Sequence, residues 1–199
     1  MNAALERMSP SITSMIRLDH THVMAAFHRF KAGLSTQRKN ALVRHACLGL
    51  EVHAQLEEEI FYPALRGVMP GNEVLDKSEP EHNQMKELIA TLRQQNPEDP
   101  SYDENFFALM RIVIHHVADE ESMLLPAAER LLPDQLASLG AQMTKRRLQL
   151  LRPHAAEIAS TAAQTFPAGV AAVALGAVAL GAMLFARSAG NANRNRWVR

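Results

Sequence analysis

The sequence predicts an all-α protein, an up-down-up-down four-helix bundle followed by an extra basic helix and an apolar C-terminal helix. Apolar residues recur every three or four positions through four long segments, which is the periodicity of an amphipathic helix face. Only 5% of the 199 residues are aromatic, and no strand-like alternation is flanked by hairpin turns. Short connections between consecutive long helices favour antiparallel neighbours, and hence a bundle.

The first two helices are predicted on either side of a short turn. The first begins near Ser11, a residue type that caps helix N-termini, and ends around Gly33, because glycine favours a helix stop. The second extends from about Gln37 to Leu65. A turn is expected after it, at Gly67 and the following Pro-Gly pair.

The next two helices are delimited by prolines. The third is predicted to begin near Ser78, with Pro80 in its first turn, and to stop at Asn96. The fourth starts after Ser101 and continues to about residue 131. We expect Pro126 to kink or tighten its last turns, because proline disrupts helix hydrogen bonding.

One polar pattern occurs twice in the chain. His53 is followed four residues later by Glu57, and the same spacing recurs at His116 and Glu120, 63 residues further on. A second pair, Asp19-His20 and Glu81-His82, repeats with an offset of 62 residues. These offsets indicate an internal duplication of a two-helix unit.

Six polar residues of this pattern interrupt otherwise apolar helix faces and are expected to point into one core. They are His20, His53, Glu57, His82, His116 and Glu120. A carboxylate on a core face carries a large desolvation cost unless it is paired, protonated or bound to a metal. The pattern therefore predicts a metal site, and its mixture of nitrogen and oxygen donors suits iron or manganese better than a thiolate-rich site would.

Composition excludes several other kinds of protein. Lys plus Arg and Asp plus Glu both number 21, so the formal net charge is zero and gives no reason to expect a nucleic-acid partner. The single cysteine, Cys47, cannot form an internal disulfide. No Gly-rich phosphate loop is present, and no nucleophile, histidine and acid share one helix face.

The pattern of polar residues resembles the hemerythrin family in its HHE cation-binding form, over roughly residues 11 to 132. The resemblance implies a four-helix bundle around a non-haem di-iron centre with an oxo or hydroxo bridge. By position, the four histidines (His20, His53, His82 and His116) would be terminal ligands, and Glu57 and Glu120 would bridge the two irons.

The sequence departs from the oxygen-carrying members at two places. Those members have two histidines four residues apart on the third helix, whereas here Lys86 and Ser78 flank His82 at that spacing. They also end the fourth helix with an aspartate five residues after a histidine, whereas this chain has Glu120 four residues after His116. With one imidazole fewer, the irons are expected to have more open positions, which counts against reversible oxygen carriage.

The pattern does not fix the roles of three residues next to the predicted ligand positions. Glu58 and Glu121 directly follow the two glutamates, and we expect them to support the metal ligands or to face solvent, with direct metal ligation as the remaining alternative. All five other histidines, His115 included, are expected at the surface. If one of them lies near the site instead, it is expected to be His115.

The leading functional hypothesis is a di-iron protein that binds or senses oxygen, nitric oxide or peroxide. Two alternatives use the same centre: an oxidase or peroxidase, with Tyr62 or Tyr102 as a redox-active neighbour, or iron storage and buffering. The expected partner is a small diatomic ligand or peroxide. A metal-binding module is favoured over an enzyme.

The C-terminal third changes character twice. Residues 133–153 are predicted as an accessory helix whose basic face is solvated or, alternatively, binds a partner, and residues 154–165 as a linker. Residues 166–186 contain no charge and, as a helix, span about 31 Å, roughly one bilayer core. Residues 187–199 form a basic tail. Small residues spaced four apart in the apolar segment are compatible with a homodimer.

We expect a protein that is tail-anchored in the inner membrane with its metal domain in the cytoplasm, the alternative being a soluble cytoplasmic protein. Four arginines after the apolar segment favour a cytoplasmic tail, but moving a whole bundle across the membrane without a signal peptide is the harder step. The protein is therefore expected to resist alkaline carbonate extraction, and protease added to intact spheroplasts is expected to leave the bundle whole. Release by carbonate would remove the anchor, and cleavage from outside would reverse the orientation.

Overall fold

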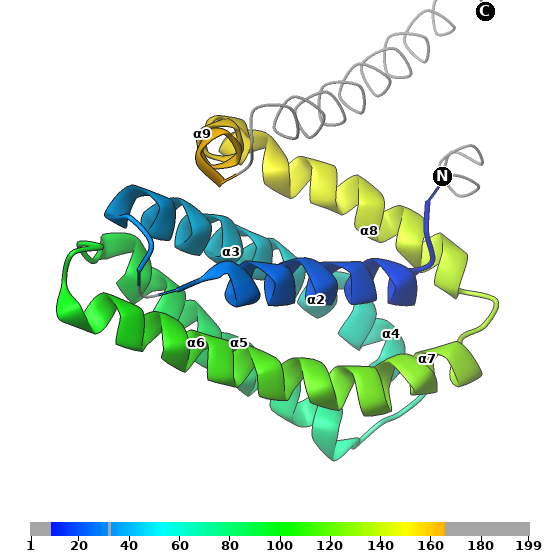
Figure 1. The fold of residues 1–199 in the computed structure, drawn as a ribbon. Coiled ribbons are helices and arrows are strands. Elements are labelled where there is room, and N and C mark those ends of the chain that lie inside the picture. The colour runs from blue at the N-terminus through cyan, green and yellow to red at the C-terminus, as the bar shows by residue number, and fades with distance from the viewer. Residues whose placement is uncertain (1–8, 32, 166–199) are drawn as a thin grey trace, which may run out of the picture.

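The computed structural model describes residues 9–31 and 33–165, and every regular element among them is helical (Figure 1). The all-α prediction is confirmed for these residues. In order, the elements are α2 (Ile12–Arg29), α3 (Thr36–Leu56), η1 (Glu57–Phe61), α4 (Tyr62–Arg66), α5 (Glu73–Gln94), α6 (Pro100–Asp119), η2 (Glu120–Leu124), α7 (Leu125–Leu131), α8 (Leu136–Leu151), η3 (Arg152–His154) and α9 (Ala155–Thr165). The elements η1 and η2 are π-helical turns, and η3 is a 3₁₀ turn.

Four long helices, α2, α3, α5 and α6, lie side by side, and short connections join each to the next (Figure 1). The fifth helix, α8, packs across α2 and α3 on the side away from α5 and α6, and α9 packs against α3. The residues expected as a linker, 154–165, thus include a helix.

The predicted membrane segment, 166–186, and the basic tail lie outside the described residues. Among the helices that the structure describes, none combines the length and the apolar character needed to cross a bilayer.

The apolar core is divided into two clusters along the bundle. One, which includes Ile16 and Leu56, lies at the end near α4, α7 and α8. The other, which includes Phe27 and Phe106, lies at the end where α2 meets α3 and α5 meets α6. Along each of the four helices the predicted metal-binding positions fall between these clusters, so the polar site is enclosed by apolar packing at both ends.

Each copy of the repeat contains a π-helical turn that begins at its glutamate. The N–H of Tyr62 bonds the carbonyl of Glu57, and the N–H of Leu125 bonds the carbonyl of Glu120, both five residues back. A proline follows each turn, at positions 63 and 126. Because proline lacks an N–H and its ring clashes with the carbonyl four residues back, the helix widens there. Of the two effects predicted for Pro126, a kink or a tightening of the helix, tightening is wrong, because the turn before it is wider.

The third long helix begins earlier than predicted. The side chain of Asn72 accepts a hydrogen bond from the N–H of Leu75, so α5 starts at Glu73 and not near Ser78. The Ser78 hydroxyl bonds the carbonyl of Val74 within the helix, and Pro80 stands inside it.

Gly140 allows α8 to approach the start of α2 closely. A Cβ at this position would collide with the carbonyl oxygen of Pro10 and would lie 3.0 Å from the backbone nitrogen of Ile12. These are backbone atoms, so they cannot yield as a flexible side chain would. Only glycine permits this spacing between the fifth helix and the bundle.

Gly140→Ala is expected to destabilise the protein by about 1–3 kcal/mol, the usual cost of overpacking, measured as a lower midpoint of urea unfolding. Gly33→Ala is the matched control, because a Cβ there would meet no atom within 4 Å. Equal midpoints for Gly140→Ala and the wild type would contradict the close packing.

Candidate metal centre

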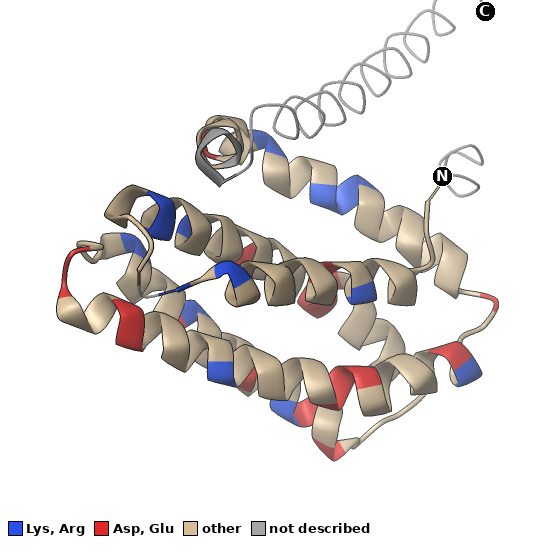
Figure 2. Cartoon of the chain, viewed as in Figure 1, with Lys and Arg blue, Asp and Glu red and all other residues tan. Residues whose placement is uncertain are grey.

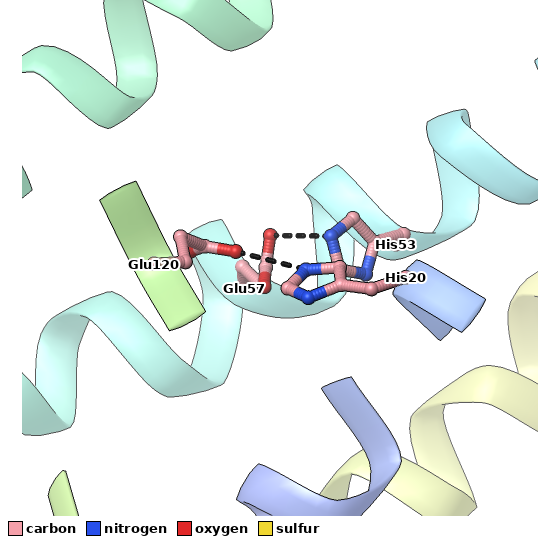
Figure 3. Close-up of side chains that lie close together, drawn as sticks. All are labelled: His20, His53, Glu57 and Glu120. Carbon is pink, nitrogen blue, oxygen red and sulfur yellow. Dashed lines mark hydrogen bonds and ion pairs between the residues drawn. The ribbon is translucent and has the colours of Figure 1, made fainter. Parts of the chain in front are cut away.

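The six side chains predicted to bind metal converge between the two apolar clusters. All are buried, and Glu57, His82 and Glu120 are completely inaccessible to solvent. Figure 3 shows His20, His53, Glu57 and Glu120 directed toward one another from α2, α3, η1 and η2. The i, i+4 spacing explains the convergence within each repeat, since it stacks a histidine above a glutamate on one face.

The donor atoms form two groups that share one carboxylate. His20, His53, Glu57 and Glu120 make the first group, and Glu57, His82 and His116 make the second; within each group the donor atoms lie within 4.8 Å of one another. Glu120 also approaches the second group, because its Oε2 lies 3.6 Å from His116 Nε2. Imidazole nitrogens and carboxylate oxygens placed in this way would hold metal.

Two of the buried atoms that could bind metal have no hydrogen-bond partner among the described residues. They are Nε2 of His53 and Oε1 of Glu57. His53 Nε2 lies 3.1 Å from Glu57 Oε2, but that contact lacks hydrogen-bond geometry. Across the site, His82 Nε2 and His116 Nε2 face each other at 3.1 Å. Unpartnered buried atoms are costly, so this donor set fits metal ions better than an internal hydrogen-bond network.

Burial sets the direction of the pKa shift for three residues of the site. It raises the pKa of Glu57 well above the usual range, and the neighbouring carboxylate of Glu120 adds to that effect. Burial also lowers the pKa of His53 and, together with the charges of His116 and His53, lowers that of His82 to about 2. The lowered pKa of each imidazole favours its neutral form, which is the form that binds metal. Against burial, the hydrogen bond between His20 and Glu120 raises the pKa of His20 and lowers that of Glu120 to about 2.

A second ring of carboxylates surrounds the four imidazoles. Each Nδ1 atom lies within hydrogen-bond distance of one acid: Asp19 for His53 (3.3 Å), Glu58 for His82 (3.0 Å), Glu81 for His116 (2.8 Å) and Glu121 for His20 (2.8 Å). With Nδ1 held by a carboxylate, the Nε2 lone pair of each ring points inward. The ring thus orients all four imidazoles for metal binding.

The repeat explains this ring, which the sequence pattern predicts only in part. Asp19 and Glu81 each precede a histidine, and each contacts the histidine of the next helix. Glu58 and Glu121, left open above, support histidines of the opposite repeat. A residue adjacent to a ligand is turned about 100° round its helix, so it faces a neighbouring helix instead of the site centre.

Three of the four outer carboxylates are each bound by a cationic side chain. Lys86 Nζ binds both oxygens of Glu58 at 2.7 and 2.8 Å, Arg17 Nε lies 3.2 Å from Glu121, and Arg147 binds both oxygens of Asp19 at 2.8 and 2.5 Å. Lys86 lies four residues after His82, at the spacing where the resemblance to oxygen-carrying members would put a further histidine. In this chain Lys86 instead binds Glu58, which contacts His82.

The basic face of α8, which Figure 2 shows along the middle of that helix, is partly paired with the bundle. Arg147 binds Asp19, and Arg146 binds both oxygens of Glu59 at 2.6 and 2.9 Å. These two arginines are therefore paired within the chain, whereas Lys145 beside them is exposed. A further group, Glu81, His115 and Asp119, lies at the surface, where His115 is exposed.

Tyr62 places a hydroxyl at the centre of the site. It donates to Glu120 Oε1 at 2.9 Å and lies 3.4 Å from Glu57 Oε2 and 3.2 Å from His82 Nε2. Burial, and then the charges of the two glutamates, raise the pKa of this hydroxyl, so it keeps its proton. The second repeat has Leu125 at the same position, so the site is asymmetric.

The sequence model of the hemerythrin HHE cation-binding domain matches residues 11–128. The chain belongs to this family. The matched segment contains all six predicted ligand positions and the complete ring of outer carboxylates. It ends before α8, which supplies Arg147.

Relatives of this hemerythrin-like chain differ in overall length. The chain is 27% identical over 122 residues to a protein of Nostoc sp. named DNA nickase, covering 61% of this chain but only 34% of that protein. It is 25% identical over 122 residues to the uncharacterised protein Rv2633c of Mycobacterium tuberculosis, covering 60% of this chain and 74% of that one.

One solved structure shares the fold. The crystal structure of an HHE cation-binding domain protein from Mycobacterium kansasii, an Rv2633c homologue, aligns with a TM-score of 0.61 at 19% identity. The alignment covers 73% of this chain and 90% of that one. At this identity the likeness establishes a common fold.

Asp19→Asn is expected to lower metal affinity about 10–100-fold, because the charge that orients His53 is lost while the shape is kept. Chelator competition on the purified protein measures the change. Asp134→Asn, in the exposed connection before α8, is the matched control. An Asp19→Asn affinity equal to that of the control would show that the outer carboxylate does not support the metal ligand.

Proposed function

We propose that the chain is a non-haem di-iron protein that binds or senses oxygen, nitric oxide or peroxide. His20, His53, His82 and His116 would hold the two irons, and Glu57 and Glu120 would bridge them. The observation that supports this most directly is the pair of buried donor groups that share Glu57.

The nature of the donors favours iron over softer metals. Imidazoles and carboxylates suit iron, whereas zinc and copper(I) sites commonly use thiolates. The one cysteine, Cys47, lies in the apolar cluster away from the site, and burial raises its pKa to about 12. It therefore offers no thiolate ligand.

The third long helix contributes a single imidazole to the proposed centre. Four residues after His82, Lys86 is held by Glu58; four residues before it, the Ser78 hydroxyl bonds the carbonyl of Val74. Neither supplies an imidazole. Iron held by the remaining donors would supply redox chemistry with open positions for a small ligand, which favours sensing or peroxide chemistry over reversible oxygen carriage.

Tyr62 gives specific support to the enzyme alternative, an oxidase or peroxidase. Its protonated hydroxyl lies within 3.4 Å of three of the proposed ligands. It can therefore donate a proton at the centre of the site. Iron storage and buffering remains the third use of the same donors.

The proposed cellular location rests on the sequence of residues 166–186 alone. We propose that this segment anchors the protein in the inner membrane with the metal domain in the cytoplasm. Self-association of its small-residue face would make the protein a homodimer.

The proposed function is tested by iron content and ligand reactivity. About two irons per chain are expected to copurify, and Glu57→Ala or Glu120→Ala is expected to lose metal and lower the melting temperature, because metal binding and folding are linked. Glu87→Ala, exposed on α5, is the control. Two irons retained after removal of both buried glutamates would refute the site.

The same preparations separate the binder from the enzyme. A stable spectral change on adding nitric oxide, without turnover of peroxide, supports binding or sensing. Steady peroxide turnover that Tyr62→Phe abolishes, with iron content unchanged, supports the enzyme.

A further inference from the structure

A cavity of about 180 Å³ lies inside the bundle beside the proposed metal centre. The four imidazoles line one part of it, and side chains from α2, α3, α5 and α6 form its walls. It extends from the site toward the apolar cluster that contains Phe27 and Phe106.

The walls offer an occupant mainly apolar surface. Ala46, Leu50, Met85, Ile89, Val113 and Val117 contribute to them. Three charged residues also line the cavity, but each is held by a partner: Asp19 by Arg147, Glu51 by Arg93, and Lys86 by Glu58. A neutral, apolar occupant therefore fits better than an ion.

The volume exceeds what a gas molecule or peroxide requires. An apolar cavity of about 150 Å³ is large enough to bind benzene, and a water molecule in the liquid takes about 30 Å³. The cavity beside the four imidazoles thus matches a single six-membered ring.

Gly49 lies at the exposed edge of this cavity, in the middle of α3. A glycine inside a helix costs about 1 kcal/mol relative to alanine. No close approach of another segment accounts for it, since a Cβ there would meet no atom within 4 Å. Because Gly49 is exposed and also lines the cavity, the cavity comes closest to solvent at a residue that has no side chain to cover it.

We propose that this cavity is a binding site for a small neutral apolar molecule about the size of a benzene ring, which enters past Gly49 and lies against the four imidazoles. The proposed site goes beyond the proposed function, because the wall that holds the molecule is built by the chain and needs no iron.

Fluorobenzene is a suitable probe, and ¹⁹F NMR of the purified full chain measures its binding while iron is quantified in each sample. One molecule per chain is expected to bind saturably. Gly49→Leu, which covers this closest point to solvent, and Ala46→Leu, which fills the interior, are each expected to weaken binding at least tenfold. Ala90→Leu, on the exposed side of α5 next to Ile89, is expected to bind like the wild type.

The two proposals fail in different ways. Absence of saturable binding up to the solubility of fluorobenzene, or equal binding by the wild type, Gly49→Leu and Ala46→Leu, overturns the cavity proposal. If the wild type binds the probe without holding iron, and either substitution weakens that binding, the cavity proposal is supported. The same result refutes only the di-iron function. Circular dichroism of each variant verifies the fold.

Discussion

The burial of two carboxylates at the centre of the bundle is the constraint on which the rest of the structure depends. Glu57 and Glu120 are completely buried, and no lysine or arginine in the described part of the chain pairs with either. Such charges are tolerated only with strong local compensation. Around them the chain arranges four imidazoles, then four acids, then three cations.

Because of the duplication, both repeats contribute the same kinds of residue to these layers, and each repeat depends on the other. Each repeat provides one outer acid for its own histidine and one for a histidine of the other repeat. Neither half can therefore orient its imidazoles alone. The residues that follow the two π-helical turns then introduce a difference. The hydroxyl of Tyr62 reaches the centre of the site, whereas Leu125 packs in the apolar cluster that includes Ile16 and Leu56. Two metal ions bound here would have unequal surroundings.

The fold class and the convergence of the six core residues were predictable, because both follow from helix periodicity. His53 and Glu57 share a face whatever surrounds them. Three features were not predictable from local pattern. The inward position of Tyr62 depends on a change of helix pitch ahead of Pro63. The outer role of Asp19 depends on which helix lies beside it. The helix α5 starts at Glu73 because Asn72, and not Ser78, caps it. That choice depends on the path of the preceding loop.

The link from Arg147 to Asp19 to His53 has a consequence for where the folded unit ends. The family match stops at residue 128, yet α8 carries Arg147, and its Gly140 packs on the backbone that opens α2. Excision at the family boundary would leave the charges of Asp19 and Glu59 without their arginines and uncover the first turn of the bundle. The smallest piece that preserves the proposed centre therefore includes α8. The appended helix is an integral wall of the domain, and transplanting the family segment alone into a fusion protein would transfer an incomplete site.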